Sequence, residues 1–182
     1  MSFETVPEIC NVYIRCKEGG RDTLILPGHN VWTNTGREYS CLIKSYNRLG
    51  QPYRSDRIAY VGLGQGTQIE VPSVTSLVDP LPWSPQVFLK RIDFGLTTHP
   101  DVGIRTAIRY HCRFPQGTFG DGLQFVSECG LFTDGDALSF VQGARNVSMD
   151  TAKQQAPIAY HTFDPIPVTP NTELEIAWEL RH

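Results

Sequence analysis

The feature that most constrains the fold is the second half of the chain, where one short strand pattern follows another. Turn-rich stretches with Gly or Pro separate these strands, and Gly (16) and Pro (13) are spread along all 182 residues. Many short strands at such spacing are typical of a β-sandwich or barrel. The sequence therefore predicts a mostly β protein, a single jelly-roll-like β-sandwich. The strands expected in this half cover residues 87–94, 103–114, 123–132, 138–140, 159–163 and 172–180.

The first 27 residues predict a hairpin. Residues 9–16 and 23–28 have strand patterns, and Gly19-Gly20 between them supplies the positive φ angles of a tight turn. We expect residues 1–27 to form an arm or hairpin that reaches a neighbouring molecule, and residues 28–182 to form the sandwich domain.

One helix is predicted, over residues 36–49. Thr35 and Glu38 have the spacing of a capping box. Apolar residues then recur at helical spacing, and Gly50 and Pro52 end the pattern. Residues 57–64 predict a strand that runs into a glycine-rich turn, and residues 73–78 fit either a short helix or a strand.

Two charged features stand out among the strands. The strand at 103–114 places Arg105, Arg109 and Arg113 on one face, which predicts that this face meets water or an acidic partner. Glu128 lies in an apolar strand, where an unpaired carboxylate is costly. We expect Glu128 to pair with one of these three arginines and to have a structural role.

Motifs for chemistry are weak. Gly62-Leu63-Gly64-Gln65-Gly66 follows a strand, but its third Gly comes one residue early for a dinucleotide fingerprint and no helix start follows. Asp134 and Asp136 flank a turn glycine and lack the further ligands of an EF-hand, so a surface calcium ion stays open. The five His fit no zinc spacing. We expect no catalytic residue, metal or cofactor, and the net charge of −3 without a basic stripe argues against nucleic acid.

The five cysteines cannot all pair within one chain. Buried free thiols are the simpler expectation. The alternative is that Cys10, Cys16 or Cys41 bridges to a neighbouring strand or chain. Cys10 and Cys16 face the same side of one strand and are too far apart to bond to each other.

Three ordered stretches carry a resemblance: residues 28–39, residues 54–67 continuing to 74–78, and Ser127-Glu128-Cys129-Gly130-Leu131-Phe132-Thr133-Asp134-Gly135-Asp136, followed by 159–163 and 174–179. This order resembles small virion structural proteins of tailed bacteriophages and, more remotely, the particle-binding domain of phage tail-collar fibres. Cys129 and His161 depart from the pattern, and no fibre shaft follows the last strand.

The resemblance implies a non-enzymatic virion subunit, above all a capsid decoration (cement) protein, with a neck, tail or collar attachment protein as the alternative. The residues that carry its central motif are Glu128, Gly130, Leu131, Phe132, Asp134 and Asp136. The implied partners are capsid or neck and tail proteins and further copies of the chain, with no membrane. We expect synthesis in a bacterial cytoplasm, because the start of the chain does not have the pattern of a signal peptide.

A carbohydrate-binding module is the alternative from a different functional class. Aromatic side chains offer stacking faces for sugars, and Trp83, in a proline-rich stretch, is the best candidate for an exposed one.

Overall fold

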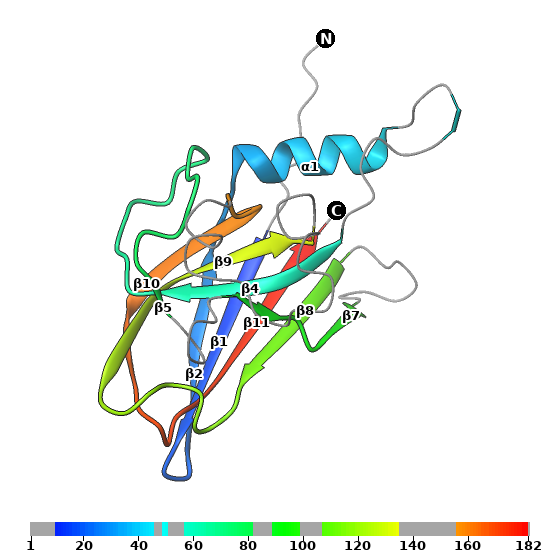
Figure 1. Cartoon of the computed structure of the whole chain (residues 1–182). Helices are drawn as coiled ribbons and strands as arrows, with labels where there is room; N and C mark the ends of the chain where they lie inside the picture. The colour runs from blue at the N-terminus through cyan, green and yellow to red at the C-terminus, as the bar shows by residue number, and fades with distance from the viewer. Residues whose placement is uncertain are drawn as a thin grey trace.

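The protein is a β-sandwich of two antiparallel sheets, seen in a computed structural model that describes residues 10–45, 49–50, 57–81, 89–98, 107–134 and 156–181 (Figure 1). One sheet has the strand order β2-β1-β11-β8-β7, and the other has the order β3-β10-β9-β4-β5, with β6 also paired to β4. The sandwich and its mostly β content agree with the sequence prediction, while the jelly-roll connectivity stays a prediction. The elements are β1 (Cys10–Glu18), β2 (Arg21–His29), β3 (Val31–Trp32), α1 (Asn34–Lys44), β4 (Ile58–Gly64), β5 (Pro80–Leu81), β6 (Leu89–Arg91), β7 (Phe94–Thr98), β8 (Ala107–Phe114), β9 (Gln124–Thr133), β10 (Ala159–Val168) and β11 (Glu173–Arg181).

The predicted N-terminal hairpin is present, and it belongs to the sandwich. β1 and β2 turn at Gly19 and Gly20, whose φ angles are 55° and 82°. β1 then pairs with β11 from Cys10↔Leu180 to Lys17↔Glu173, so that it lies between two strands of its own sheet. Residues 10–27 are therefore a structural part of the sheet rather than an arm that extends from it. Residues 1–9 lie outside the described residues.

The helix begins earlier than the sequence predicted. Its N-cap is Thr33, whose Oγ1 accepts a hydrogen bond from the Gly36 amide at 3.1 Å, and the capping box at Thr35 is not used. The Thr33 hydroxyl also donates to the carbonyl oxygen of Pro157 at 2.5 Å, which ties the cap to the loop before β10. α1 ends at Lys44, before the expected stop at Gly50.

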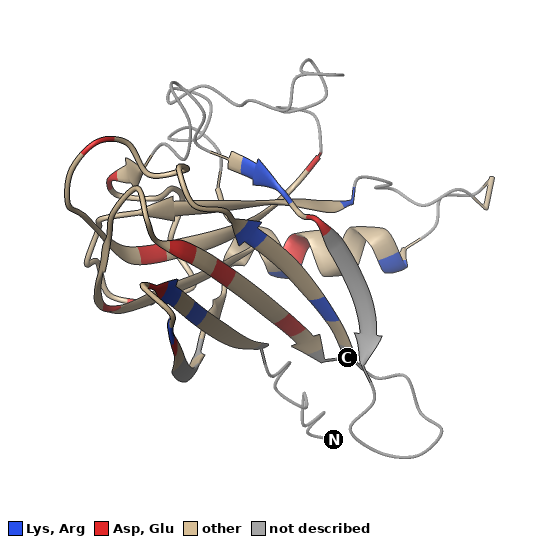
Figure 2. Ribbon diagram, turned by 90° about the horizontal axis from the view of Figure 1, so that it is seen from below, with Lys and Arg blue, Asp and Glu red and all other residues tan. Residues whose placement is uncertain are grey.

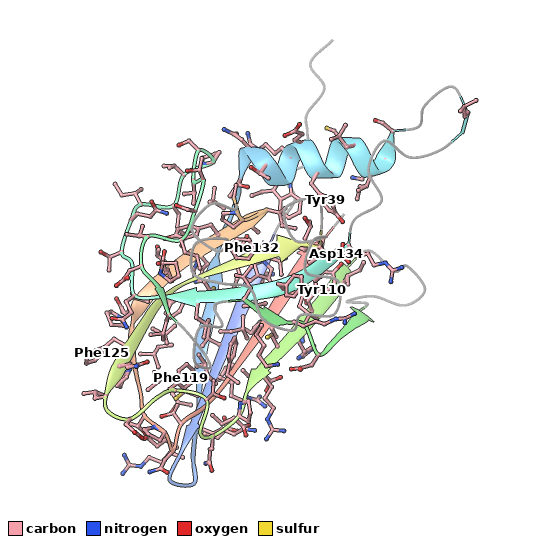
Figure 3. All side chains as sticks on the ribbon, viewed as in Figure 1. Tyr39, Tyr110, Phe119, Phe125, Phe132 and Asp134 are labelled. Carbon is pink, nitrogen blue, oxygen red and sulfur yellow. The ribbon has the colours of Figure 1, made fainter. Side chains whose placement is uncertain are left out.

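The core lies between the two sheets. Alternate residues of β11 point into it, with Trp178 fully buried, and Cys112 and Phe114 of β8 pack beside them. Tyr39 closes one end from α1, and Figure 3 shows it under the helix, on the side of the strands. A second, smaller cluster contains Val74, Leu77, Leu89, Phe132 and Tyr160. Val74 and Leu77 reach it from turns and bends, so residues 73–78 form neither the helix nor the strand considered above.

Candidate functional site

A buried carboxylate lies at the centre of the most polar region of the fold. Glu128 of β9 is fully buried, and both of its oxygens accept hydrogen bonds. Oε1 accepts from the amides of Gly66 (3.1 Å) and Asp79 (2.9 Å), while Oε2 accepts from the Val78 amide (3.2 Å) and the Tyr160 hydroxyl (2.6 Å). Burial, followed by this hydrogen bond, raises the pKa of Tyr160. The predicted pairing of Glu128 with an arginine is thus wrong, because backbone amides of the 65–79 loop and one hydroxyl satisfy its charge.

The glycines of the glycine-rich turn leave the space in which the Glu128 carboxylate approaches the backbone. A Cβ atom on Gly64 would lie 2.2 Å from Oε1 of Glu128, and one on Gly66 would lie 2.6 Å from the same oxygen. A Cβ atom on Gly62 would lie 2.7–3.0 Å from side-chain atoms of Leu89, Leu77 and Phe132. Side chains at these positions would displace either the carboxylate or the core. The three glycines therefore have a packing role in the fold.

The remaining residues of the Ser-Glu-x-Gly-Leu-Phe motif are structural as well. Ser127 Oγ donates to the Gly66 carbonyl oxygen at 2.9 Å, and a Cβ on Gly130 would lie 3.0 Å from the Phe132 ring. Leu131 belongs to the main core and Phe132 to the smaller cluster. Asp134 caps the end of the β4–β9 pair, where its Oδ1 accepts from the Arg57 amide at 2.5 Å. Asp136 lies outside the described residues.

A second inward-facing carboxylate, which sequence reasoning missed, holds the middle of the same loop. Oε1 of Glu70 accepts hydrogen bonds from His161 Nδ1 (2.7 Å) and from the Thr162 amide (2.6 Å). Burial alone would raise the pKa of Glu70, but these hydrogen bonds outweigh it and the net pKa is lowered. The His161 ring packs on Gly28 of β2, where a Cβ would lie 2.1 Å from the ring. Glu70 thereby connects the loop to β10, and the His161 ring extends this contact to the edge of the other sheet.

The outer face of the five-stranded sheet carries alternating rows of charge. Figure 2 shows acidic residues following one another along one strand, with basic residues on its neighbours. The acidic strand is β11. Its Glu179 accepts from Arg109 Nε (3.1 Å) and Nη2 (2.5 Å), Glu175 pairs with His111 (3.0 Å), and Glu173 pairs with Arg113 and with Lys17 (3.4 Å). Of the two environments predicted for the arginine face, water or an acidic partner, Arg109 and Arg113 have the acidic partner, and it is a strand of the same chain.

A shallow depression of about 320 Å³ opens on this charged face. It lies where Ala177 stands between Tyr13 and His111 in one cross-strand row, so that its small side chain leaves the row hollow. Arg109 lies over the Tyr13 ring at 4.7 Å. A second hollow, of about 430 Å³, lies beside Cys16 and the Asp164–Pro167 segment of β10.

The cysteines and tryptophans occupy varied positions. Cys112 and Cys129 are fully buried, and burial raises the pKa of both thiols, to about 12 for Cys112. Cys16 and Cys41 are free in this single chain, with Cys41 exposed, and an inter-chain bridge at either stays a prediction. Cys10 begins β1, and its side chain lies outside the described part. Trp83 is not among the described residues.

Among the described residues, no group of three or more His, Cys, Asp and Glu side chains is placed to hold a metal ion. Within the same ranges, no helix has the length and the hydropathy that crossing a bilayer requires.

Comparisons with known proteins place the chain in no family. No protein-family model matches it, and no curated protein or solved structure is significantly similar to it.

Proposed function

We propose that this protein is a structural subunit of a tailed-phage virion, a capsid decoration protein that acts by binding rather than by catalysis. The observation that carries the proposal is that the stretches resembling phage virion proteins meet in one place. Glu128 of the third stretch bonds to Gly66 and Val78 of the second and to Tyr160, which follows the third. The separate sequence likenesses therefore belong to one folding unit, which is what shared ancestry would preserve.

The buried Glu128 and the half-buried Glu70 support a role in stability. All four donors around Glu128 point at its two oxygens, so its hydrogen-bonding capacity is used in holding the 65–79 loop. Glu70 is held by a histidine, a backbone amide and a threonine hydroxyl. A carboxylate that serves as a general base needs an accessible oxygen aimed at a substrate, and Glu128, fully buried with both oxygens bonded, does not have that arrangement.

The attachment itself is expected from surface contacts repeated on a symmetric particle. Each contact of one decoration subunit can be weak, because many copies on one lattice bind with a high effective concentration. The paired charges of the five-stranded sheet's outer face suit such contacts, since rim charges set specificity and orientation more than affinity.

The experiment is a copy-number measurement on purified particles of the virus that encodes the chain. Quantitative gel densitometry against the major capsid protein should give on the order of hundreds of copies for a decoration subunit. A copy number on the order of ten would instead indicate a neck or tail protein. Absence of the chain from washed particles would overturn the proposal altogether.

A further inference from the structure

From Thr67 to Val71 the chain has no turn or bend, and it alternates in burial in the opposite sense to an ordinary surface strand. Thr67, Ile69 and Val71 are exposed, with Ile69 at 80% and Val71 at 40%, while the residues between them turn inward. The inward residues are the polar ones: Gln68 and the carboxylate of Glu70. A surface strand usually hides its apolar side and shows its polar side. Here three β-branched side chains in a row face outward.

The structure holds this segment firmly in place. Gln68 Nε2 donates to the Ser76 carbonyl oxygen at 3.2 Å, and Glu70 is bound by His161 and Thr162. The amide of Asn34, at the start of α1, donates to the Pro72 carbonyl oxygen at 2.7 Å. Figure 1 shows the segment between the end of β4 and the start of α1. Because the conformation is fixed in advance, a partner that binds it loses little conformational entropy.

The carbonyl oxygens of Val71 and Pro72 accept backbone hydrogen bonds from Val74 and Asn34, but the backbone before them is unused. Within the described part of the chain, no backbone hydrogen bond joins Thr67, Gln68, Ile69 or Glu70 to another residue, and none of them belongs to a strand pair. An extended backbone with free N–H and C=O groups is a template for another strand. Natural edge strands block this with Lys, Pro or a bulge, and no Lys or Pro occurs from Thr67 to Val71.

We propose that Thr67–Val71 pairs antiparallel with the same segment of a second copy of this chain, about a two-fold axis at Ile69. The segment suits itself: the two-fold places Ile69 opposite Ile69 and Thr67 opposite Val71, which are β-branched cross-strand pairs of the favourable kind. Like charges do not oppose each other on the outer side, because the one charged residue, Glu70, points inward to His161. This inference does not depend on the proposed virion role.

Such a contact is small. Pairing of five residues buries roughly 300 Å² on each copy, well below the roughly 800 Å² per partner of a stable interface. We therefore expect a transient dimer in dilute solution, which becomes effective when copies are held near one another.

Engineered disulfides test both the contact and its register. In a chain with Cys41→Ser, Ile69→Cys should form inter-chain disulfides about tenfold faster than Leu123→Cys, because opposite Cβ atoms in such a pair lie about 4.5–5.5 Å apart. Leu123 is the matched control, since it is an aliphatic residue that is 60% exposed. Mixing Thr67→Cys with Val71→Cys should give the hetero-linked dimer, whereas Thr67→Cys alone should not couple, because its two copies lie about 13 Å apart in this register.

Each result decides the proposal. Equal rates for Ile69→Cys and Leu123→Cys would overturn it, as would coupling of Thr67→Cys with itself as fast as with Val71→Cys. In assembled particles, Ile69→Cys could instead form a disulfide with a different virion protein. If the purified chain then showed no self-coupling, the partner of the segment would be that protein, and pairing with a second copy would be refuted. Circular dichroism of each variant checks that the fold is intact, which we expect at positions this exposed.

Discussion

Replacing Glu128 by Gln tests whether the buried carboxylate holds the fold together. Gln has nearly the same shape, but one carboxylate oxygen becomes an amide NH₂ group that donates instead of accepting. Each oxygen of Glu128 now accepts from two donors. With the NH₂ group toward Gly66 and Asp79, two amides lose their acceptor. With it toward Val78 and Tyr160, only the Val78 amide does, because the Tyr160 hydroxyl can turn and accept from the NH₂ group.

The magnitude follows from the more favourable orientation, in which one donor is left without an acceptor. Such a donor costs about 1–3 kcal/mol, so Glu128→Gln should lower the free energy of unfolding by about 1–3 kcal/mol. That is a sizeable share of the roughly 5–15 kcal/mol of a typical domain. Tyr160→Phe removes one hydrogen bond and should cost about 1–2 kcal/mol. The double variant should cost more than Glu128→Gln alone, because the hydroxyl that could accept from the amide NH₂ group is then missing.

Urea unfolding followed by tryptophan fluorescence measures these free energies, and Trp178 is a fully buried reporter. Hydrogen exchange gives a local reading, since the Val78 amide, which bonds to the same oxygen as Tyr160, should lose protection in Glu128→Gln. Glu38→Gln, on the exposed side of α1, is the isosteric control and should stay within about 0.5 kcal/mol of the parent chain. A Glu128→Gln variant as stable as this control, with the Val78 amide still protected, would refute the reasoning.

Three further predictions concern the other polar contacts. Arg109→Ala should cost about 2–3 kcal/mol in chemical unfolding, because it removes two hydrogen bonds from Glu179, a carboxylate with only 3% of its side chain exposed. Hydrogen bonding holds the pKa of Glu70 below its ordinary value, so its contribution is complete above its unfolded pKa of about 4.3 and is lost as the pH falls through its lower folded value. Glu70→Gln should therefore flatten the acid limb of a stability–pH curve, and an unchanged slope would contradict this. Gly28→Ala, whose Cβ would lie 2.1 Å from the His161 ring, should lower the melting temperature, and His161→Ala should partly rescue it.

The local patterns of the sequence predicted the elements better than their ends. The β1–β2 hairpin follows from its Gly-Gly turn, and most strand positions follow from alternation and turn spacing. The start of the helix could not be predicted in the same way, because Thr33 and Thr35 can both serve as an N-cap residue. The choice between them is made by contacts far along the chain. Gly36 packs so closely on the Ile158 carbonyl that a Cβ would lie 2.0 Å from its oxygen, and the Thr33 hydroxyl reaches Pro157.

Polar partners were predicted less well than elements. The face with Arg105, Arg109 and Arg113 was expected to meet water or an acidic partner. Arg109 and Arg113 pair with the acidic β11, while Arg105 lies outside the described residues. The register that places β11 beside β8 is set by the whole sheet. Glu128 was expected to pair with an arginine, because opposite charge is the signal that a sequence shows. Its actual partners are mainly backbone amides, which every residue except proline carries and no pattern can single out. The visible clue was the glycine spacing at 62, 64 and 66, which fits close backbone approach as well as it fits a phosphate loop.

The 67–72 segment shows how such a contact can reverse a pattern. The sequence Thr-Gln-Ile-Glu-Val alternates like a half-buried strand, and alternation alone would turn Ile69 inward and Glu70 to water. The structure does the opposite, because His161 and the Thr162 amide offer Glu70 donors inside the fold. A carboxylate can turn into a fold at low cost only where hydrogen-bond donors are available to it. The inward turn of Glu70 then forces its neighbours outward by the two-residue period of an extended chain. The exposed apolar row is thus a consequence of the buried hydrogen bonds, and the Glu70→Gln and Ile69→Cys experiments probe the two faces of one arrangement.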